Sequence, residues 1–240
     1  MGTIINLLLI AILIVCVWSG YKKGIVMGIG GILAIIVSLY GANLLAGAFS
    51  YEVIPALRPF ASGFMEQRIS GDGGVLHRMG WDDYDYSVAD LLERYPDETD
   101  KFAAECFESL GIDETSADLM AQAAIKSSDE SGAAITDAVV TVLCEKVSFA
   151  GCFILAFILI LIILTVIGNL PNLSYKIPHM DTLNDIGGAV LGLLTGLMFC
   201  FIIVWVLKFA GMIIGEDTLA SSFITRTLLK ANIVTRYLGF

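Results

Sequence analysis

The sequence predicts an all-α, polytopic membrane protein with four transmembrane helices and a small helical extracytoplasmic domain. Hydrophobic residues make up 57% of the chain and charged residues only 16%, and the mean hydropathy is +0.81. A soluble domain of this length needs more polar surface than that to cover its core. Long apolar segments recur along the chain, and none has the short alternating pattern of a membrane barrel strand.

Four apolar segments are long enough to cross a bilayer as helices, which takes about 18–20 residues. They are 2–19, 25–48, 147–170 and 186–214. The first of them is not expected to be a cleaved secretory signal. No positive charges precede it, and the residues that follow it make a poor cleavage site.

These segments divide the chain into four predicted parts. They are a first transmembrane hairpin (1–48), an acidic helical extracytoplasmic domain (49–146), a second transmembrane hairpin (147–214) and a tail (215–240).

Lysines in the two short connections predict the orientation. Lys22 and Lys23 follow the first span, and Lys176 lies between the third and fourth spans. Because lysine and arginine close to span ends favour the cytoplasmic side, both connections are expected to be cytoplasmic. The segment 49–146 carries 20 acidic and 7 basic residues, a net charge of −13. It and both termini are therefore predicted to be extracytoplasmic.

The acidic segment shows four helical patterns, at 82–95, 97–111, 113–127 and 133–151, and the last is expected to continue into the third span. The glycine-rich residues 71–80 are predicted to form a mobile loop. The apolar residues at helical spacing in the first two patterns are Val88, Leu91, Leu92, Tyr95, Phe102, Cys106, Phe107 and Leu110.

No metal, cofactor or catalytic site is predicted. The acidic residues in 82–85 lack the glycine and glutamate spacing of a calcium-binding EF-hand loop. His77 and His179 fall in different loops, which argues against a paired zinc site and leaves no base beside a nucleophile. Cys106 and Cys144 are expected to be buried thiols, with a disulfide as the alternative. The protein is therefore predicted not to be an enzyme.

Two runs of glycines with a spacing of four residues predict close helix contacts. Such spacing leaves a smooth groove along an apolar helix, in which another backbone can lie. The contact is expected either inside one chain or between copies in a homo-oligomer. The glycines are Gly20, Gly24, Gly28, Gly188, Gly192 and Gly196.

The tail 215–240 has the pattern of an amphipathic helix lying in the membrane interface. Apolar residues share one helical side and basic residues the other, a pattern that favours anionic headgroups. The alternative is a helix docked on the acidic domain. The residues that carry the pattern include Phe223, Ile224, Arg226, Leu228 and Lys230.

The membrane portions resemble the colicin V production protein (CvpA) family. The resemblance rests on the Gly-Tyr-Lys-Lys-Gly step at 20–24, on "LNDIGGAVLGLLTGLM" at 183–198 and on "ASSFITRTLLK" at 220–230. It covers 4–48 and 147–230, and the acidic segment looks like a long insertion.

The chain departs from the family pattern at three positions. Asn6 stands where Asp is common, Asp185 where a basic residue is expected, and Thr195 where Lys or Arg often follows. The resemblance implies a bacterial cytoplasmic (inner) membrane protein linked to toxin production or export and to cell-envelope or biofilm processes. It implies no agreed biochemical activity.

Three functions are therefore considered. The first is a non-enzymatic membrane protein of this family, the second a small oligomeric channel or transporter component, and the third a membrane anchor for an acidic ligand-binding domain. The expected partners are the lipid bilayer, a second copy of the chain and an envelope protein that contacts the acidic domain. No nucleic acid partner is expected.

Overall fold

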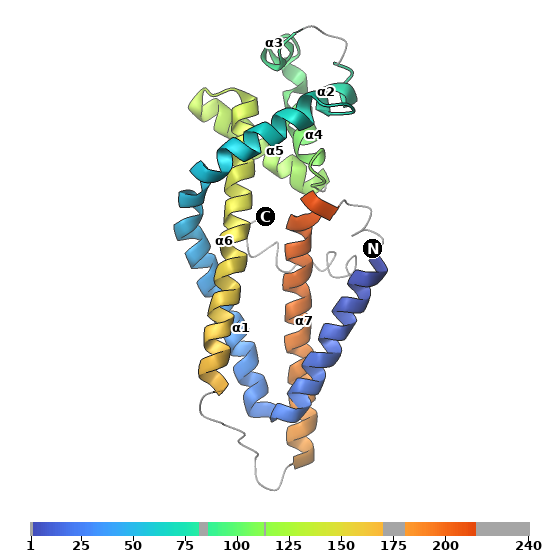
Figure 1. Ribbon diagram of the computed structural model, residues 1–240, viewed down its shortest axis with the longest axis vertical. Helices are drawn as coiled ribbons and strands as arrows, with labels where there is room; N and C mark the ends of the chain where they lie inside the picture. The colour runs from blue at the N-terminus through green and yellow to red at the C-terminus, as the bar shows by residue number, and fades with distance from the viewer. Residues whose placement is uncertain (1, 82–85, 113, 170–180, 215–240) are drawn as a thin grey trace. The chain divides into compact units, whose positions relative to one another are not determined.

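The computed structural model describes residues 2–81, 86–112, 114–169 and 181–214, and over these residues it contains helices and no strands. The all-α class predicted from the sequence is thus confirmed for this part of the chain. In chain order the elements are α1 (Gly2–Ser70), α2 (Val75–Arg78), α3 (Val88–Arg94), the 3-10 helix η1 (Pro96–Glu98), α4 (Thr99–Glu108), α5 (Glu114–Ser131), α6 (Ile135–Asn169) and α7 (Asp181–Ile214) (Figure 1).

Three of the described helices, α1, α6 and α7, are long and apolar enough to cross a membrane. Few residues in their apolar stretches are buried, and many large apolar side chains are exposed, including Leu7, Leu155 and Leu159. Water does not tolerate apolar faces of this extent, whereas lipid does. The count of four spans stays a prediction, because it requires α1 to cross the membrane twice.

Helix α1 changes direction at Gly24, which has a φ of +77° and a ψ of −178°. This backbone conformation is open to glycine and strained for any residue with a Cβ atom. The residues before and after Gly24 therefore form two legs that meet at a sharp turn (Figure 1). The first leg is about 33 Å long at 1.5 Å per residue, which matches the thickness of the hydrocarbon core.

The chain divides into two compact units. The first holds Met1–Ala48 and Gly151–Lys208, and the second holds Phe49–Ala150 together with 209–214. The predicted hairpin ends at 48, but α1 continues without a break to Ser70, past two prolines. The acidic segment therefore begins as an extension of a membrane helix, which the sequence analysis did not foresee.

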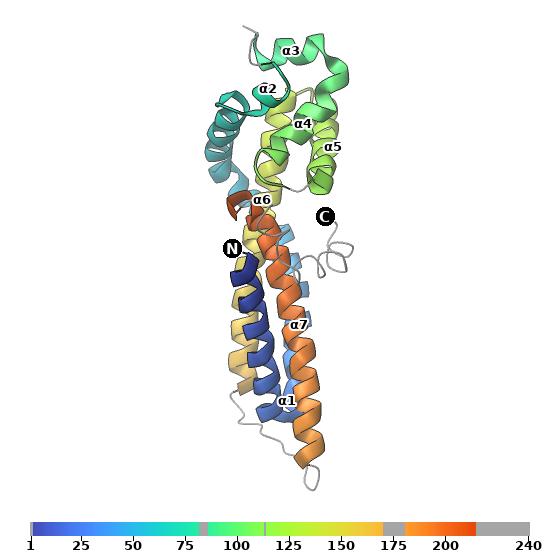
Figure 2. The ribbon, with the colours of Figure 1, turned by 90° about the vertical axis from the view of Figure 1, so that its right-hand side faces the viewer.

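In the first unit, α7 lies beside the first leg of α1 (Figure 2). Leu9, Cys200 and Val204 form a small buried cluster between them. The Cys200 thiol lies 3.8 Å from the carbonyl oxygen of Leu9. The second leg of α1 approaches α6, since a Cβ atom added at Gly41 would lie 2.8 Å from the Ile160 side chain.

The second unit has a conventional hydrophobic core. All four apolar residues that the sequence analysis named for 97–111 are buried in it: Phe102, Cys106, Phe107 and Leu110. Trp81 stacks on Phe102 with ring centroids 6.2 Å apart and on Tyr95 with centroids 5.9 Å apart. Helix α3 starts at a capping box, in which Ser87 and Asp90 bond to each other's backbone N–H groups.

The prediction of a loop over 71–80 is wrong in part. Residues Val75–Arg78 form the short helix α2, and the Val75 side chain is fully buried. Gly73 and Gly80 flank this turn with positive φ angles of 69° and 70°. The glycines therefore allow the chain to reverse around the buried Val75, and Val75 and Leu76 anchor the segment in the core.

Candidate functional site

The turn of α1 is held by an asparagine from α7. The side chain of Asn184 is only 3% exposed, and its Oδ1 accepts a hydrogen bond from the backbone N–H of Ile25 at 3.0 Å. Ile25 begins the second leg, where a backbone N–H has no acceptor within its own helix. A Cβ atom added at Gly24 would overlap the amide of Asn184. Asn184 thus caps a helix from a distant part of the chain, and only glycine fits beside it.

Four of the six predicted packing glycines meet in one contact between α1 and α7. A Cβ atom added at Gly20 would overlap the carbonyl oxygen of Gly188 and lie 2.8 Å from the Cα of Gly192. A Cβ atom added at Gly188 would lie 2.8 Å from the Cα of Gly24. These are backbone-to-backbone approaches, the kind that small residues at a spacing of four permit between apolar helices.

The other two glycines of the runs face side chains. A Cβ atom at Gly28 would lie 2.8 Å from the Cβ of Leu191, and one at Gly196 would lie 3.0 Å from the Cβ of Cys16. The structure therefore places both runs in contacts within a single chain. It holds one copy, so a homo-oligomeric contact stays a prediction.

The two lysines of the turn have different surroundings. The ammonium group of Lys22 lies 5.0 Å from the centroid of the Trp18 ring, in a cation–π contact. Lys23 instead lines a cavity of about 330 Å³ within the first unit. In the sequence the two lysines are equivalent signals of orientation. The structure shows that only Lys23 lines the cavity.

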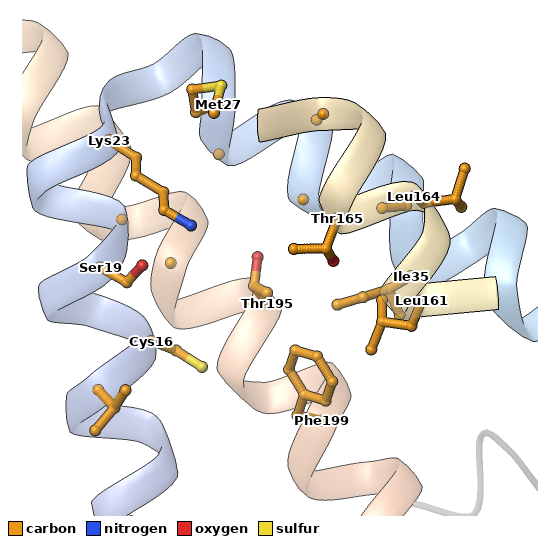
Figure 3. Close-up of a pocket in the computed structure, with 18 residues that line it drawn as sticks. Cys16, Ser19, Lys23, Met27, Ile35, Leu161, Leu164, Thr165, Thr195 and Phe199 are labelled. Carbon is orange, nitrogen blue, oxygen red and sulfur yellow. The ribbon is translucent and has the colours of Figure 1, made fainter. Parts of the chain in front are cut away.

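The cavity is polar at one side and apolar elsewhere. Figure 3 shows Lys23, Ser19 and Thr195 pointing toward one another across it. The Thr195 hydroxyl donates to the carbonyl oxygen of Leu191 at 2.8 Å. The apolar part of the wall comes from all three long helices and includes Ile35, Leu161, Leu164 and Phe199.

The second unit holds two thiols that are candidates for a disulfide. Cys106 and Cys144 are both free and buried in the core cluster. Burial, with a smaller effect of the neighbouring Glu105 carboxylate, raises the pKa of the Cys106 thiol to about 12. Glu105 also lies 3.5 Å from Arg78 in an ion pair. Cys106 is thus an unreactive core residue in this structure.

Several predicted residues lie outside the part that the structure describes. They are Lys176, His179, the acidic residues of 82–85 and the whole predicted interfacial tail, 215–240. Over the described ranges, no group of three or more His, Cys, Asp or Glu side chains could hold a metal ion.

Asn184 is the site residue that the sequence analysis missed. It lies in the quoted stretch "LNDIGG", one residue before Asp185 and four before Gly188. An amide at the start of an apolar, glycine-rich helix needs a hydrogen-bond partner once it is buried, and that was the available signal. The partner is a backbone group 159 residues away in the sequence, so no local pattern points to it.

The long apolar helices define the chain as a membrane protein. Residues 121–232 match the sequence model of the family described as Colicin V production protein. The match confirms the resemblance seen in the sequence. It begins inside the acidic segment, in α5, and takes in α6 and α7. No curated protein and no solved structure matches the chain.

Proposed function

We propose that this protein is a multi-pass, non-enzymatic protein of the bacterial cytoplasmic membrane that acts in toxin production or export and in cell-envelope processes. The observation that carries the proposal is the family match over 121–232. That region contains Asn184, Gly188 and Gly192, which contact the turn of α1. The matched region thus includes the residues on which the packing of the membrane unit depends.

The proposed topology has four crossings, because the two legs of α1 each exceed the length of a span. The Lys22 and Lys23 turn is cytoplasmic in this proposal, and the second unit and both termini are extracytoplasmic. An envelope protein that contacts the acidic second unit, or a second copy of the chain, would complete the assembly.

The proposal is tested by toxin secretion in a colicin V producer that lacks its own colicin V production protein. Expression of this chain should restore the zone of killing on a sensitive lawn. Asn184→Leu should restore less, because it loosens the turn of α1, whereas Asn43→Leu changes an exposed residue and should match wild type. No restoration by wild-type protein that reaches the membrane at a normal level would contradict the proposal.

A second candidate function is a small oligomeric channel or transporter component. The cavity with Lys23, Ser19 and Thr195 at one side favours it, because hydroxyls and single charges line many conduction paths. Liposomes that contain the purified protein should then show ion flux above that of empty liposomes, and equal flux would remove this candidate.

A further inference from the structure

Among the described residues that line the cavity of the first unit, Lys23 is the single charged one. No carboxylate forms an ion pair with it over the described residues. Lys23 is an exposed residue, so its ammonium group stays hydrated at the open side of the cavity and places a positive charge beside the apolar walls. An anionic group on a ligand would complement the charge of Lys23 at this cavity.

Of the two neighbouring hydroxyls, only that of Ser19 suits an anion. The Thr195 hydroxyl donates its hydrogen to the backbone of α7 and so offers an anion no donor. Ser19, which points to the same side as Lys23 in Figure 3, carries a hydroxyl donor. An ammonium group and a hydroxyl donor side by side are suited to oxygen atoms of an anion such as a phosphate ester.

The rest of the cavity is suited to a hydrocarbon chain. Its far side lies away from the turn residues Lys23 and Met27. Each of the three long helices contributes to that side, through Ile35, Leu161 and Phe199. Glycines supply further wall, and a Cβ atom added at Gly31 would meet no atom within 4 Å. At about 330 Å³ the space is that of a small-ligand site.

We propose that this cavity binds the phosphate headgroup of an anionic membrane lipid at Lys23 and Ser19, with the start of an acyl chain along the apolar wall. Charge complementarity selects an anion, and the apolar far side selects an amphipathic one. Basic pockets between membrane helices near the cytoplasmic surface bind anionic headgroups in this way. The site requires only that the first unit lies in a membrane, so it stands or falls separately from the proposed function in toxin export.

Lys22 provides the matched control. It has the same charge and lies next to Lys23 in the same turn, but it contacts Trp18 instead of the cavity. If Lys23 acts only by general attraction to a negative surface, Lys22→Gln and Lys23→Gln should lower the affinity for anionic lipid equally. If the lipid binds at the cavity, Lys23→Gln should lower this affinity and Lys23→Arg should preserve it.

The test uses the full chain in a non-ionic detergent, with bound lipid counted by native mass spectrometry. Wild type should retain phosphatidylglycerol in preference to phosphatidylcholine. Lys23→Gln should lower the affinity for phosphatidylglycerol at least about fivefold, since one lysine near a lipid surface contributes about that factor. Lys22→Gln should stay within about twofold of wild type. Equal loss in both variants, or equal retention of the two lipids by wild type, would overturn the proposal.

A second variant separates binding from folding. Gly31→Leu places a side chain where the structure has open space and improves helix propensity, so it should fold while reducing phosphatidylglycerol binding. Undiminished binding by a folded Gly31→Leu would contradict the cavity as the site. A competition experiment with soluble glycerol phosphate distinguishes a lipid from a free phosphate ester. Glycerol phosphate should not displace the bound phosphatidylglycerol at equal concentration, and displacement would assign the site to a soluble phosphate instead.

Discussion

Replacing Gly192 with leucine tests the close contact between α1 and α7. A Cβ atom at this position would overlap the carbonyl oxygen of Cys16 and lie 3.1 Å from the Cα of Gly20. Both neighbours are backbone atoms, so the contact is relieved only if the helices move apart. Overpacking of this kind costs about 1–3 kcal/mol. At about 2–4 °C per kcal/mol for a protein of this size, we expect the melting temperature to fall by about 2–12 °C.

The assay is thermal unfolding in a mild detergent, with the size of the particle measured in the same detergent. Gly47→Leu is the matched control, because an added Cβ atom there meets no atom within 4 Å and leucine is the better helix former. Its melting temperature should equal or exceed that of wild type. If Gly192→Leu were as stable as Gly47→Leu, the packing argument would fail. If instead the particle became smaller while each chain stayed folded, the glycines would join subunits.

Three further predictions follow from other parts of the molecule. Asn184→Leu leaves the N–H of Ile25 without an acceptor and should cost about 1–3 kcal/mol in the same unfolding assay, and no change would contradict the capping interaction. Cys106, whose pKa is raised from 9.0 to about 12 by burial, should react with a thiol reagent at pH 8 about a thousandfold more slowly in the folded protein than after denaturation. A cysteine introduced at the exposed Asp97 of a variant without native cysteines should react with an impermeant reagent in intact cells, and protection there would reverse the proposed orientation.

The pKa of Cys106 also sets a direction for stability. The folded state holds the thiol proton more tightly than the unfolded state. The contribution of Cys106 to the free energy of unfolding is therefore fully present below about pH 9. It is lost as the pH rises from there toward about 12. The difference in the free energy of unfolding between wild type and Cys106→Ala should therefore shrink over this range, and a constant difference would show that the thiol does not titrate there.

The sequence alone determined the helical class, the apolar segments and most of the core of the second unit. Each of these depends on a local property: the length of an apolar run, or the spacing of residues such as Phe102 and Phe107 along one helix. The glycine runs were recognised for the same reason, since a spacing of four residues is a repeat that the sequence displays directly.

The tertiary structure decided what those local features do. Only the fold brings Asn184 to the N–H of Ile25 and places Lys23 at a cavity that α6 and α7 help to line. These contacts join residues whose separation in the chain is set by the path of α6 and of the second unit between them, and no local period encodes it. Burial gives the Asn184 contact its importance, because a polar group removed from water has to find its partner wherever the packing places one.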